Sequence, residues 1–145
     1  MPGKESLLKN QYYANSRNSF WLIMGAILDI PEGASYLEGT NALLSGKLAL
    51  WDVLKACTRE SSLDSDIVES SIICNDFQEF YASHPLISKV LFNGAKAEAL
   101  YMKYVHPDLP DKFKNIKYVR LPSTSPANAR QTLKDKIDAW QAIVS

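Results

Sequence analysis

Three apolar runs of strand length alternate with segments of helical character, and this alternation limits the possible folds more than any other feature of the chain. The runs span residues 48–54, 89–93 and 116–122. Short runs that are mostly apolar are typical of parallel strands covered on both faces. Strands that alternate with helices predict right-handed crossovers, and hence an α/β fold: a three-layer α/β/α sandwich around a short parallel sheet.

The segments around these runs carry helix signals. Residues 20–28 place apolar side chains at the i, i+3, i+4, i+7 and i+8 positions of an amphipathic helix. A shorter helix is predicted over 36–45, with Gly46 as a left-handed C-cap. We also expect a helix over 77–83, capped by the preceding Asn-Asp pair, and another over 95–104, which is rich in Ala, Lys and Glu.

The C-terminal part of the chain predicts a loop and a last helix. Residues 105–115 carry Asp, Pro and Leu-Pro turn signals and are expected to form a surface loop. Ser125 followed by Pro126 has the pattern of an N-cap and a first helical residue. We therefore expect the last helix to begin there and to run to the C-terminus.

The length of 145 residues predicts one domain, spanning 1–145. An apolar fraction of 46% and a charged fraction of 22% are typical of a globular chain. No run reaches the roughly 18 to 20 apolar residues that a membrane span needs. The N-terminus lacks the pattern of a secretory signal or a transit peptide. We therefore expect a cytoplasmic monomer without a membrane partner.

Charge is balanced overall but uneven along the chain. Sixteen Lys and Arg stand against sixteen Asp and Glu. Residues 61–104 hold three basic and six acidic side chains, a net charge of −3, and residues 105–145 hold seven basic and four acidic ones, a net charge of +3. Overall charge therefore cannot attract nucleic acid, and a basic face would have to lie late in the chain. Ordinary solvated charges explain the same pattern.

The spacing of the cysteines and histidines matches neither a metal site nor a nucleophilic catalytic group. Cys57 and Cys74 lie in no C-x-x-C motif and have no paired histidine, so we expect reduced thiols, no metal site and no cofactor. His84 and His106 each precede a proline and are expected at the surface. Asp52 fits a buried acid, and it also fits a capping or salt-bridged residue.

Polar residues lie at or directly after the carboxyl ends of the three predicted strands, where a parallel sheet binds its ligands. They are Asp52, Asn93 and the Ser/Thr-rich segment 123–128. The Asn93 amide offers a donor and an acceptor, the pair that reads the edge of a base. Segment 123–128 is predicted at a helix N-terminus, where it could bind an anion or simply cap the helix.

Residues 10–18 form a further candidate binding segment. Two tyrosines, several amides and an arginine occur there without clear periodicity. Stacking and hydrogen-bonding groups of this kind suit a planar ligand, although an ordinary N-terminal loop would have a similar composition.

The order of short motifs resembles the hypoxanthine-DNA (deoxyinosine) glycosylases of the uracil-DNA glycosylase superfamily. The similarity runs from Met1 to about Trp140. A shorter pattern, N-x-F-W followed by L-P-S, is also similar to mismatch-specific uracil and thymine glycosylases. The motifs that carry the resemblance are M-P-G-K-E-S-L, Q-Y-Y-A-N-S-R-N-S-F-W, L-A-L-W-D-V-L, S-L-D-S-D-I, N-D-F, F-N-G-x-K-A and L-P-S-T-S-P-A-N.

The resemblance implies hydrolysis of the N-glycosidic bond of a deaminated base in DNA, without a metal or a covalent enzyme intermediate. The implied substrate is DNA that contains hypoxanthine, with uracil and xanthine as further candidate bases. Asn18 would help to position the attacking water, and Asn93 would hold the flipped base. The resemblance also assigns base contacts to Tyr12, Tyr13 and Asn15, the loop beside the sugar to Pro2 and Gly3, and DNA contacts to Ser123, Thr124, Ser125, Asn128 and Arg130.

Two departures from the superfamily pattern bear on the activity. Leu121 stands where classical uracil enzymes place a histidine, which argues against a His-assisted mechanism. The family's first motif follows a buried strand, and this chain begins inside that motif, so we expect the strand to be missing and residues 1–145 to be marginally stable. Two alternatives therefore stay open: a non-catalytic remnant that binds damaged DNA, and a mismatch-specific uracil-DNA glycosylase.

Overall fold

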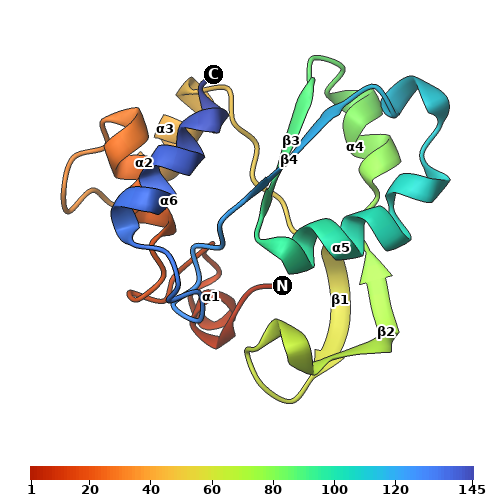
Figure 1. The fold of residues 1–145 in the computed structure, drawn as a ribbon, viewed down its shortest axis with the longest axis horizontal. Coiled ribbons are helices and arrows are strands. Elements are labelled where there is room, and N and C mark those ends of the chain that lie inside the picture. The colour runs from red at the N-terminus through yellow and green to blue at the C-terminus, as the bar shows by residue number, and fades with distance from the viewer. The chain divides into compact units, whose positions relative to one another are not determined.

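A computed structural model describes residues 1–145, and the chain in it forms two compact units (Figure 1). The first unit comprises residues 52–121 together with Met1, and the second comprises residues 2–51 and 122–145. No helix has both the length and the apolar character needed to cross a membrane.

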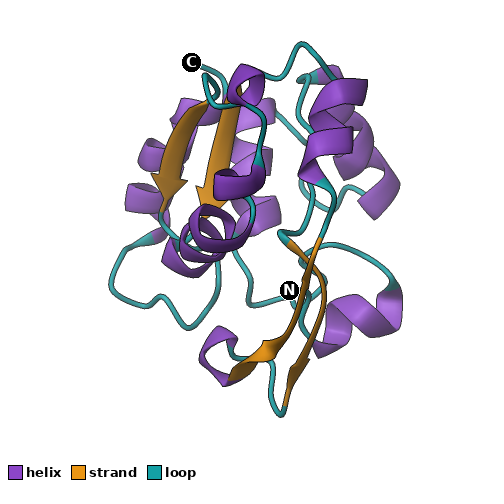
Figure 2. Cartoon of the chain, turned by 90° about the vertical axis from the view of Figure 1, so that its right-hand side faces the viewer, coloured by secondary structure: helices purple, strands orange, loops and turns teal.

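A parallel pair of strands and an antiparallel pair make up the β-structure of the first unit. Its elements are β1 (Leu54–Arg59), β2 (Ile67–Cys74), α4 (Phe77–Ser83), β3 (Lys89–Asn93), α5 (Ala95–Tyr104) and β4 (Lys117–Leu121), with short 3-10 turns at Asp64–Asp66, His106–Asp108 and Asp111–Phe113. Figure 2 shows β3 and β4 as neighbouring arrows that point the same way. The α/β class and the short parallel sheet are thus confirmed.

The core of the first unit forms on one face of the parallel pair. Tyr81 from α4 and Tyr101 from α5 are buried there beside Phe92 of β3. The Tyr101 hydroxyl lies 2.6 Å from that of Tyr81 and 3.3 Å from that of Tyr118 on β4. Burial raises the pKa of Tyr81 to about 12 and also raises the pKa of Tyr101. The tyrosines therefore stay neutral and link the two helices to the sheet.

The second unit is helical. Its elements are α1 (Lys4–Lys9), α2 (Phe20–Leu28), α3 (Tyr36–Ser45) and α6 (Leu133–Trp140), with a final 3-10 turn at Gln141–Ile143. Phe20, Ile23 and Met24 of α2 are at most 3% exposed, and the Trp140 and Phe20 rings pack edge-to-face with centroids 5.9 Å apart. The predicted helices over 20–28 and 36–45 are confirmed. Helix α1 was not predicted, because Leu7 and Leu8 are exposed and provide no apolar face.

The strand predicted over 48–54 is wrong. Residues 48–53 form no regular element, and Trp51 is 37% exposed. Leu54 instead begins β1, which pairs antiparallel with β2. The β-branched residues of β2 and the Ser/Asp-rich turn before it were the hairpin signal. An apolar run becomes a strand only where a partner strand pairs with it, and partners are a property of the tertiary structure.

The start predicted for the last helix is also wrong. Helix α6 begins after Thr132 and not after Ser125. The Thr132 hydroxyl accepts from the Asp135 N–H at 3.1 Å, and the Asp135 carboxylate accepts from the Thr132 N–H at 3.0 Å. This reciprocal capping box satisfies the first turn better than Ser125 and Pro126 could. Segment 123–128 is therefore a loop and has no helix N-terminus of its own.

Two smaller predictions also need correction. Gly46 has φ −77°, and Lys47 takes the left-handed position at φ 58°. The helix end is still closed, because Leu48 N–H donates to the Leu43 carbonyl at 2.9 Å, as in a Schellman motif. Segment 105–115 is only partly a surface loop, since Val105 and Leu109 are buried in the core of the first unit.

Candidate active site

Asn18 occupies the turn that leads into α2. Its side-chain Oδ1 accepts from the Phe20 N–H at 3.0 Å, and its own N–H donates to the Asn15 carbonyl at 2.9 Å. These two bonds hold the amide at the helix entry. An amide oxygen has two lone pairs, so Oδ1 can accept from Phe20 N–H and still accept one bond from a water molecule. The half-buried Asn18 is thus able to orient a nucleophilic water.

Ser19 joins this turn to the loop that follows β4. Its N–H and its hydroxyl both donate to the Thr124 carbonyl, at 3.0 and 3.1 Å. The Thr124 side chain is only 1% exposed. Two segments that lie more than a hundred residues apart in the sequence are therefore fixed together beside Asn18. Sequence reasoning missed Ser19, whose only signal was its place next to Asn18.

The loop over 122–128 is ordered by its own polar groups. The Ser123 hydroxyl accepts from Ser125 N–H at 3.2 Å, and the Ser125 hydroxyl accepts from Ala127 N–H at 3.2 Å. The Asn128 amide donates to the Ser123 carbonyl at 3.1 Å. Each serine hydroxyl uses one lone pair here and keeps its hydrogen as a donor. The loop is thus compact and still able to donate to an anion.

Helix α6 supports this loop from two positions. The Trp140 Nε1 donates to the Pro122 carbonyl at 2.9 Å. The Lys136 ammonium donates to the Asn128 carbonyl at 3.0 Å. Both ends of the loop are therefore anchored to the same helix.

The two candidate stacking residues precede α2. The Tyr13 ring stacks on Phe20 with centroids 4.1 Å apart, and Tyr13 adopts a left-handed backbone with φ 53°. Tyr12 is held by its backbone, which donates to the Tyr36 hydroxyl at 3.1 Å and accepts from Trp21 Nε1 at 3.0 Å. Both side chains are half-buried. Segment 10–18 is thus an ordered part of the second unit.

The remaining predicted residues of the second unit lie in different settings. Asn15 is half-buried, and its side chain accepts from the Arg17 N–H at 2.9 Å, which stabilises the turn before Asn18. Arg130 is exposed after the 122–128 loop. Pro2 and Gly3 directly precede α1, with Gly3 as its N-cap residue.

Asn93 belongs to the first unit. It ends β3 opposite Leu121 of β4, at the carboxyl end of the parallel pair. Gly94 follows with φ 95° and donates to the Leu121 carbonyl at 3.0 Å before α5 begins. A side chain at position 94 would be strained by this positive φ. The half-buried Asn93 side chain is thus held at a sharp strand-to-helix turn.

Asp52 is a partly buried, salt-bridged acid. Its carboxylate lies 4.0 Å from the Met1 ammonium, and its carbonyl accepts from Asn75 Nδ2 at 2.7 Å. Burial raises the pKa of Asp52, and the nearby Met1 and Arg59 charges oppose this shift. The prediction of a salt-bridged residue is confirmed, although the carboxyl is also desolvated.

The other titratable groups form no second site. His84 is exposed as predicted, whereas His106 is half-buried with Tyr118 at 5.5 Å between ring centroids. Cys57 and Cys74 are free thiols, as predicted. No three His, Cys, Asp or Glu side chains come together as a metal-binding group.

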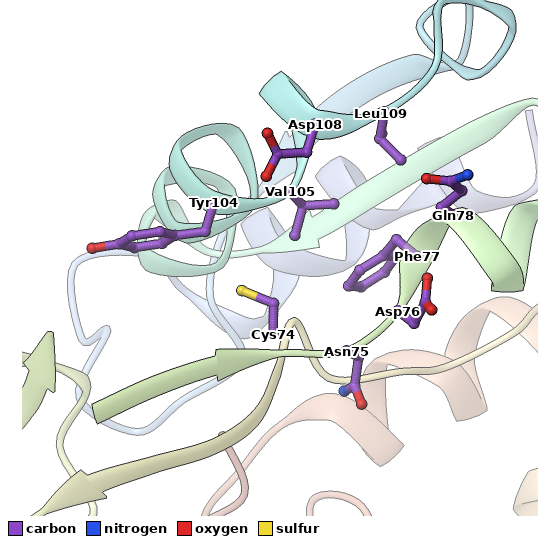
Figure 3. Close-up of a pocket in the computed structure, with 9 residues that line it drawn as sticks. All are labelled: Cys74, Asn75, Asp76, Phe77, Gln78, Tyr104, Val105, Asp108 and Leu109. Atoms are coloured by element: carbon purple, nitrogen blue, oxygen red, sulfur yellow. The ribbon is translucent and has the colours of Figure 1, made fainter. Parts of the chain in front are cut away.

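A pocket in the first unit contains none of the predicted site residues (Figure 3). One of its polar residues, Asp76, serves the fold, because it caps α4 by accepting from Glu79 N–H at 3.0 Å. Burial raises the pKa of the Cys74 thiol, which disfavours the reactive thiolate. The pocket is lined by Cys74, Asn75, Asp76, Phe77, Gln78, Tyr104, Val105, Asp108 and Leu109.

Comparison with known proteins identifies the family. No protein-family model matches the sequence. A protein of Methanosarcina acetivorans named hypoxanthine DNA glycosylase is 35% identical over 99% of this chain and 85% of its own length. A protein of Methanosarcina barkeri with the same name is 37% identical over 67% of this chain and 61% of its own length. The resemblance seen in the motifs is confirmed, and the chain belongs to the hypoxanthine DNA glycosylase family.

Proposed function

We propose that this chain is a monofunctional DNA glycosylase that removes hypoxanthine from DNA by hydrolysing its N-glycosidic bond. One observation carries the proposal: the match to a protein named hypoxanthine DNA glycosylase extends over 99% of the chain. The arrangement around Asn18 supports it, because the amide is fixed by the fold and keeps an acceptor for water. Action as a cytoplasmic monomer stays a prediction from the sequence.

The reaction requires the target nucleotide to leave the duplex. A base in the stack hides its sugar, and a wrongly paired base costs less to extrude. Water then attacks C1′ while the bond from C1′ to the base nitrogen breaks. The electron pair of that bond leaves on the base, and the water loses a proton to solvent. The sugar becomes cationic on the way, so no strong base is needed if the water is well placed.

We assign the water to Asn18 and the base to Asn93. Asn18 Oδ1 would accept a hydrogen bond from the water and direct its lone pair at C1′. Asn93, at the end of β3, would bond the flipped base and stabilise the negative charge that develops on it. Tyr12, Tyr13 and Asn15 would complete the base contacts, with Pro2 and Gly3 beside the sugar.

The 122–128 loop would bind the DNA backbone. Its serines keep hydroxyl hydrogens that can bond phosphate oxygens. Arg130 follows the loop and is exposed, so it can approach a neighbouring phosphate. Contacts of this kind orient the duplex without reading its sequence.

The test is base release from labelled duplexes. Duplexes with a single deoxyinosine, deoxyuridine or deoxyxanthosine are incubated with the protein, and abasic sites are then cleaved with alkali. We expect strand cleavage at deoxyinosine, and only after the alkali step, because a monofunctional enzyme leaves the backbone intact.

The other outcomes separate the alternatives. Cleavage at deoxyuridine alone would support a mismatch-specific uracil enzyme in place of the proposed one. Tight binding to the deoxyinosine duplex without release of any base would support a non-catalytic binding protein. Cleavage before alkali treatment would contradict the monofunctional mechanism.

A further inference from the structure

Lys136 is the only charged residue among the buried residues of the structure. It lies on α6 and is 6% exposed. Its Nζ makes one hydrogen bond, to the Asn128 carbonyl at 3.0 Å, and no carboxylate lies within 4.0 Å of it. Neighbouring Lys134 is exposed and pairs with Asp138 at 3.1 Å. The exposed Lys134 thus has a carboxylate partner on the same helix, and the buried Lys136 has none.

An unpaired buried ammonium needs an explanation. Taking a charge out of water is costly, and folded proteins compensate such charges with a partner of opposite sign. An ammonium has three donor hydrogens, and the Asn128 carbonyl uses only one of them. Burial accordingly lowers the pKa of Lys136. A site that keeps a cation at this cost is able to attract an anion to the adjoining surface.

The surface beside Lys136 is the 122–128 loop. The ammonium is bonded directly to the last residue of this loop, and the Asn128 amide in turn bonds the Ser123 carbonyl. Ser123 and Ser125 keep hydroxyl donors. The loop is also tied to the Asn18 turn through Ser19 and the Thr124 carbonyl. An anion bound on the loop would therefore have a fixed position relative to Asn18, the proposed water-positioning residue.

We propose that Lys136 is the buried counter-charge for a DNA phosphate bound on the 122–128 loop, and that it positions this loop through the Asn128 carbonyl. The ligand is a phosphodiester of the duplex near the extruded nucleotide. The role rests on the proposed function, because that function is what brings DNA to the loop. Lys136 is a positioning residue and does not touch the reacting atoms.

The test compares the salt dependence of DNA binding for the wild-type 145-residue chain, Lys136→Met and Lys136→Gln. Fluorescence anisotropy measures the affinity for an undamaged duplex, which cannot be turned over, and for a deoxyinosine duplex. Each phosphate contact contributes about 0.9 to the slope of log K against log salt. We expect both variants to lose about 0.9 of slope and to bind about eightfold more weakly at ~0.1 M salt.

Lys134→Met is the matched control, because it removes the same charge from the same helix at an exposed position. It should keep the wild-type slope. Equal slope changes for Lys134→Met and Lys136→Met would overturn the proposal, since net charge alone would then explain the effect. A wild-type slope for both Lys136 variants would overturn it too.

Stability and rescue separate charge from structure. Met fills the buried space without a charge, so Lys136→Met should melt at or above the wild-type temperature while it binds DNA more weakly. If this variant does not fold, Lys136→Arg decides: it keeps the charge and must retain the wild-type slope. A wild-type protein that binds DNA but releases no base would contradict the proposed function. The salt slopes of DNA binding would still test the role of Lys136, because they do not depend on base release.

Discussion

At the scale of single residues, the amide of Asn18 takes part in the fold, and we propose that it also takes part in the chemistry. Its oxygen accepts from Phe20 N–H at the start of α2, next to the N-cap residue Ser19, and the same oxygen has a lone pair left for water. A replacement therefore changes two properties at once. Variants must separate the loss of the hydrogen bond to Phe20 from the loss of the bond to water.

We expect Asn18→Ala to lower kcat about 100-fold and to change DNA affinity little, because orientation of the water counts only on the way to the transition state. Loss of the hydrogen bond to Phe20 N–H should also reduce stability by about 1 kcal/mol. Asn18→Ser is the control, since a serine hydroxyl can accept from the N–H two residues on, as the Asn18 amide does. Single-turnover kinetics and thermal melts measure both effects. A serine variant with the wild-type rate would mean that Asn18 has a structural role only.

For Asn93 we propose a role in the recognition of the base. Asn93→Ala should lower kcat/KM for hypoxanthine release, because it removes hydrogen bonds to the flipped base. The expected loss corresponds to roughly 1 to 3 kcal/mol of transition-state stabilisation. The ratio of hypoxanthine to uracil release should change as well, since the two bases present different groups to the amide. Competition between deoxyinosine and deoxyuridine duplexes measures this ratio. An unchanged ratio of hypoxanthine to uracil release would show that Asn93 does not recognise the base.

At the scale of elements, α2 and α3 pack closely because Gly39 has no side chain. A Cβ at Gly39 would lie 2.8 Å from the Trp21 ring. That ring cannot easily move away, because its Nε1 is bonded to the Tyr12 carbonyl and it packs edge-to-face with the Tyr36 ring, with centroids 5.7 Å apart. The helix pair thus positions the segment that carries Tyr12 and Tyr13.

Gly39→Ala and Gly25→Ala form a matched pair of helix substitutions. Alanine gains about 1 kcal/mol over glycine inside a helix. At Gly39 the clash with Trp21 should cost roughly 1 to 3 kcal/mol and outweigh this gain, so the melting temperature should fall. At Gly25 the nearest atom is the Ile30 carbonyl oxygen at 3.5 Å, an ordinary contact, so the melting temperature should rise. Equal shifts for the two variants would contradict the close packing.

At the scale of the whole molecule, the net charge of zero gives no sign of two ionisable side chains that the fold removes from water. Lys136 is buried without a carboxylate partner, and Asp52 is partly buried beside the Met1 ammonium. Each contributes a dependence of folding stability on pH or on bound anions that the net charge of zero would not predict.

Asp52 should make the protein less stable as the pH rises. Burial raises the pKa of Asp52 above its ordinary 3.8, so the folded chain holds this proton to a higher pH than the unfolded chain. Stability from this group is therefore present below about pH 3.8 and is lost as the pH rises through the folded pKa. Asp52→Asn should be more stable than wild type near pH 7 and equally stable at about pH 3.

Denaturant unfolding at both pH values measures the Asp52 effect. Asp108→Asn is the control, since Asp108 is an exposed aspartate of the same unit. It should change the free energy of unfolding near pH 7 by less than about 0.5 kcal/mol. An Asp52→Asn variant that is less stable near neutral pH would mean that attraction to the Met1 ammonium outweighs desolvation.

The sequence by itself determined the elements whose signals are local. Helix periodicity located α2, the Asn-Asp pair located the cap of α4, and the apolar run before Gly94 located β3. Capping, periodicity and turn residues act within a few positions along the chain. The order of motifs also identified the family, because it preserves residues of common ancestry whatever their local structure.

Only the tertiary structure decided which segments pair and which polar groups meet. The run at 48–54 is no strand because it lacks a partner, and Ser125 caps no helix because Thr132 and Asp135 form a better box. The bond from Ser19 to Thr124 joins residues 105 positions apart, and Lys136 shows its burial only in the folded chain. Pairing and burial depend on which distant segments meet, and no local window of sequence contains that information.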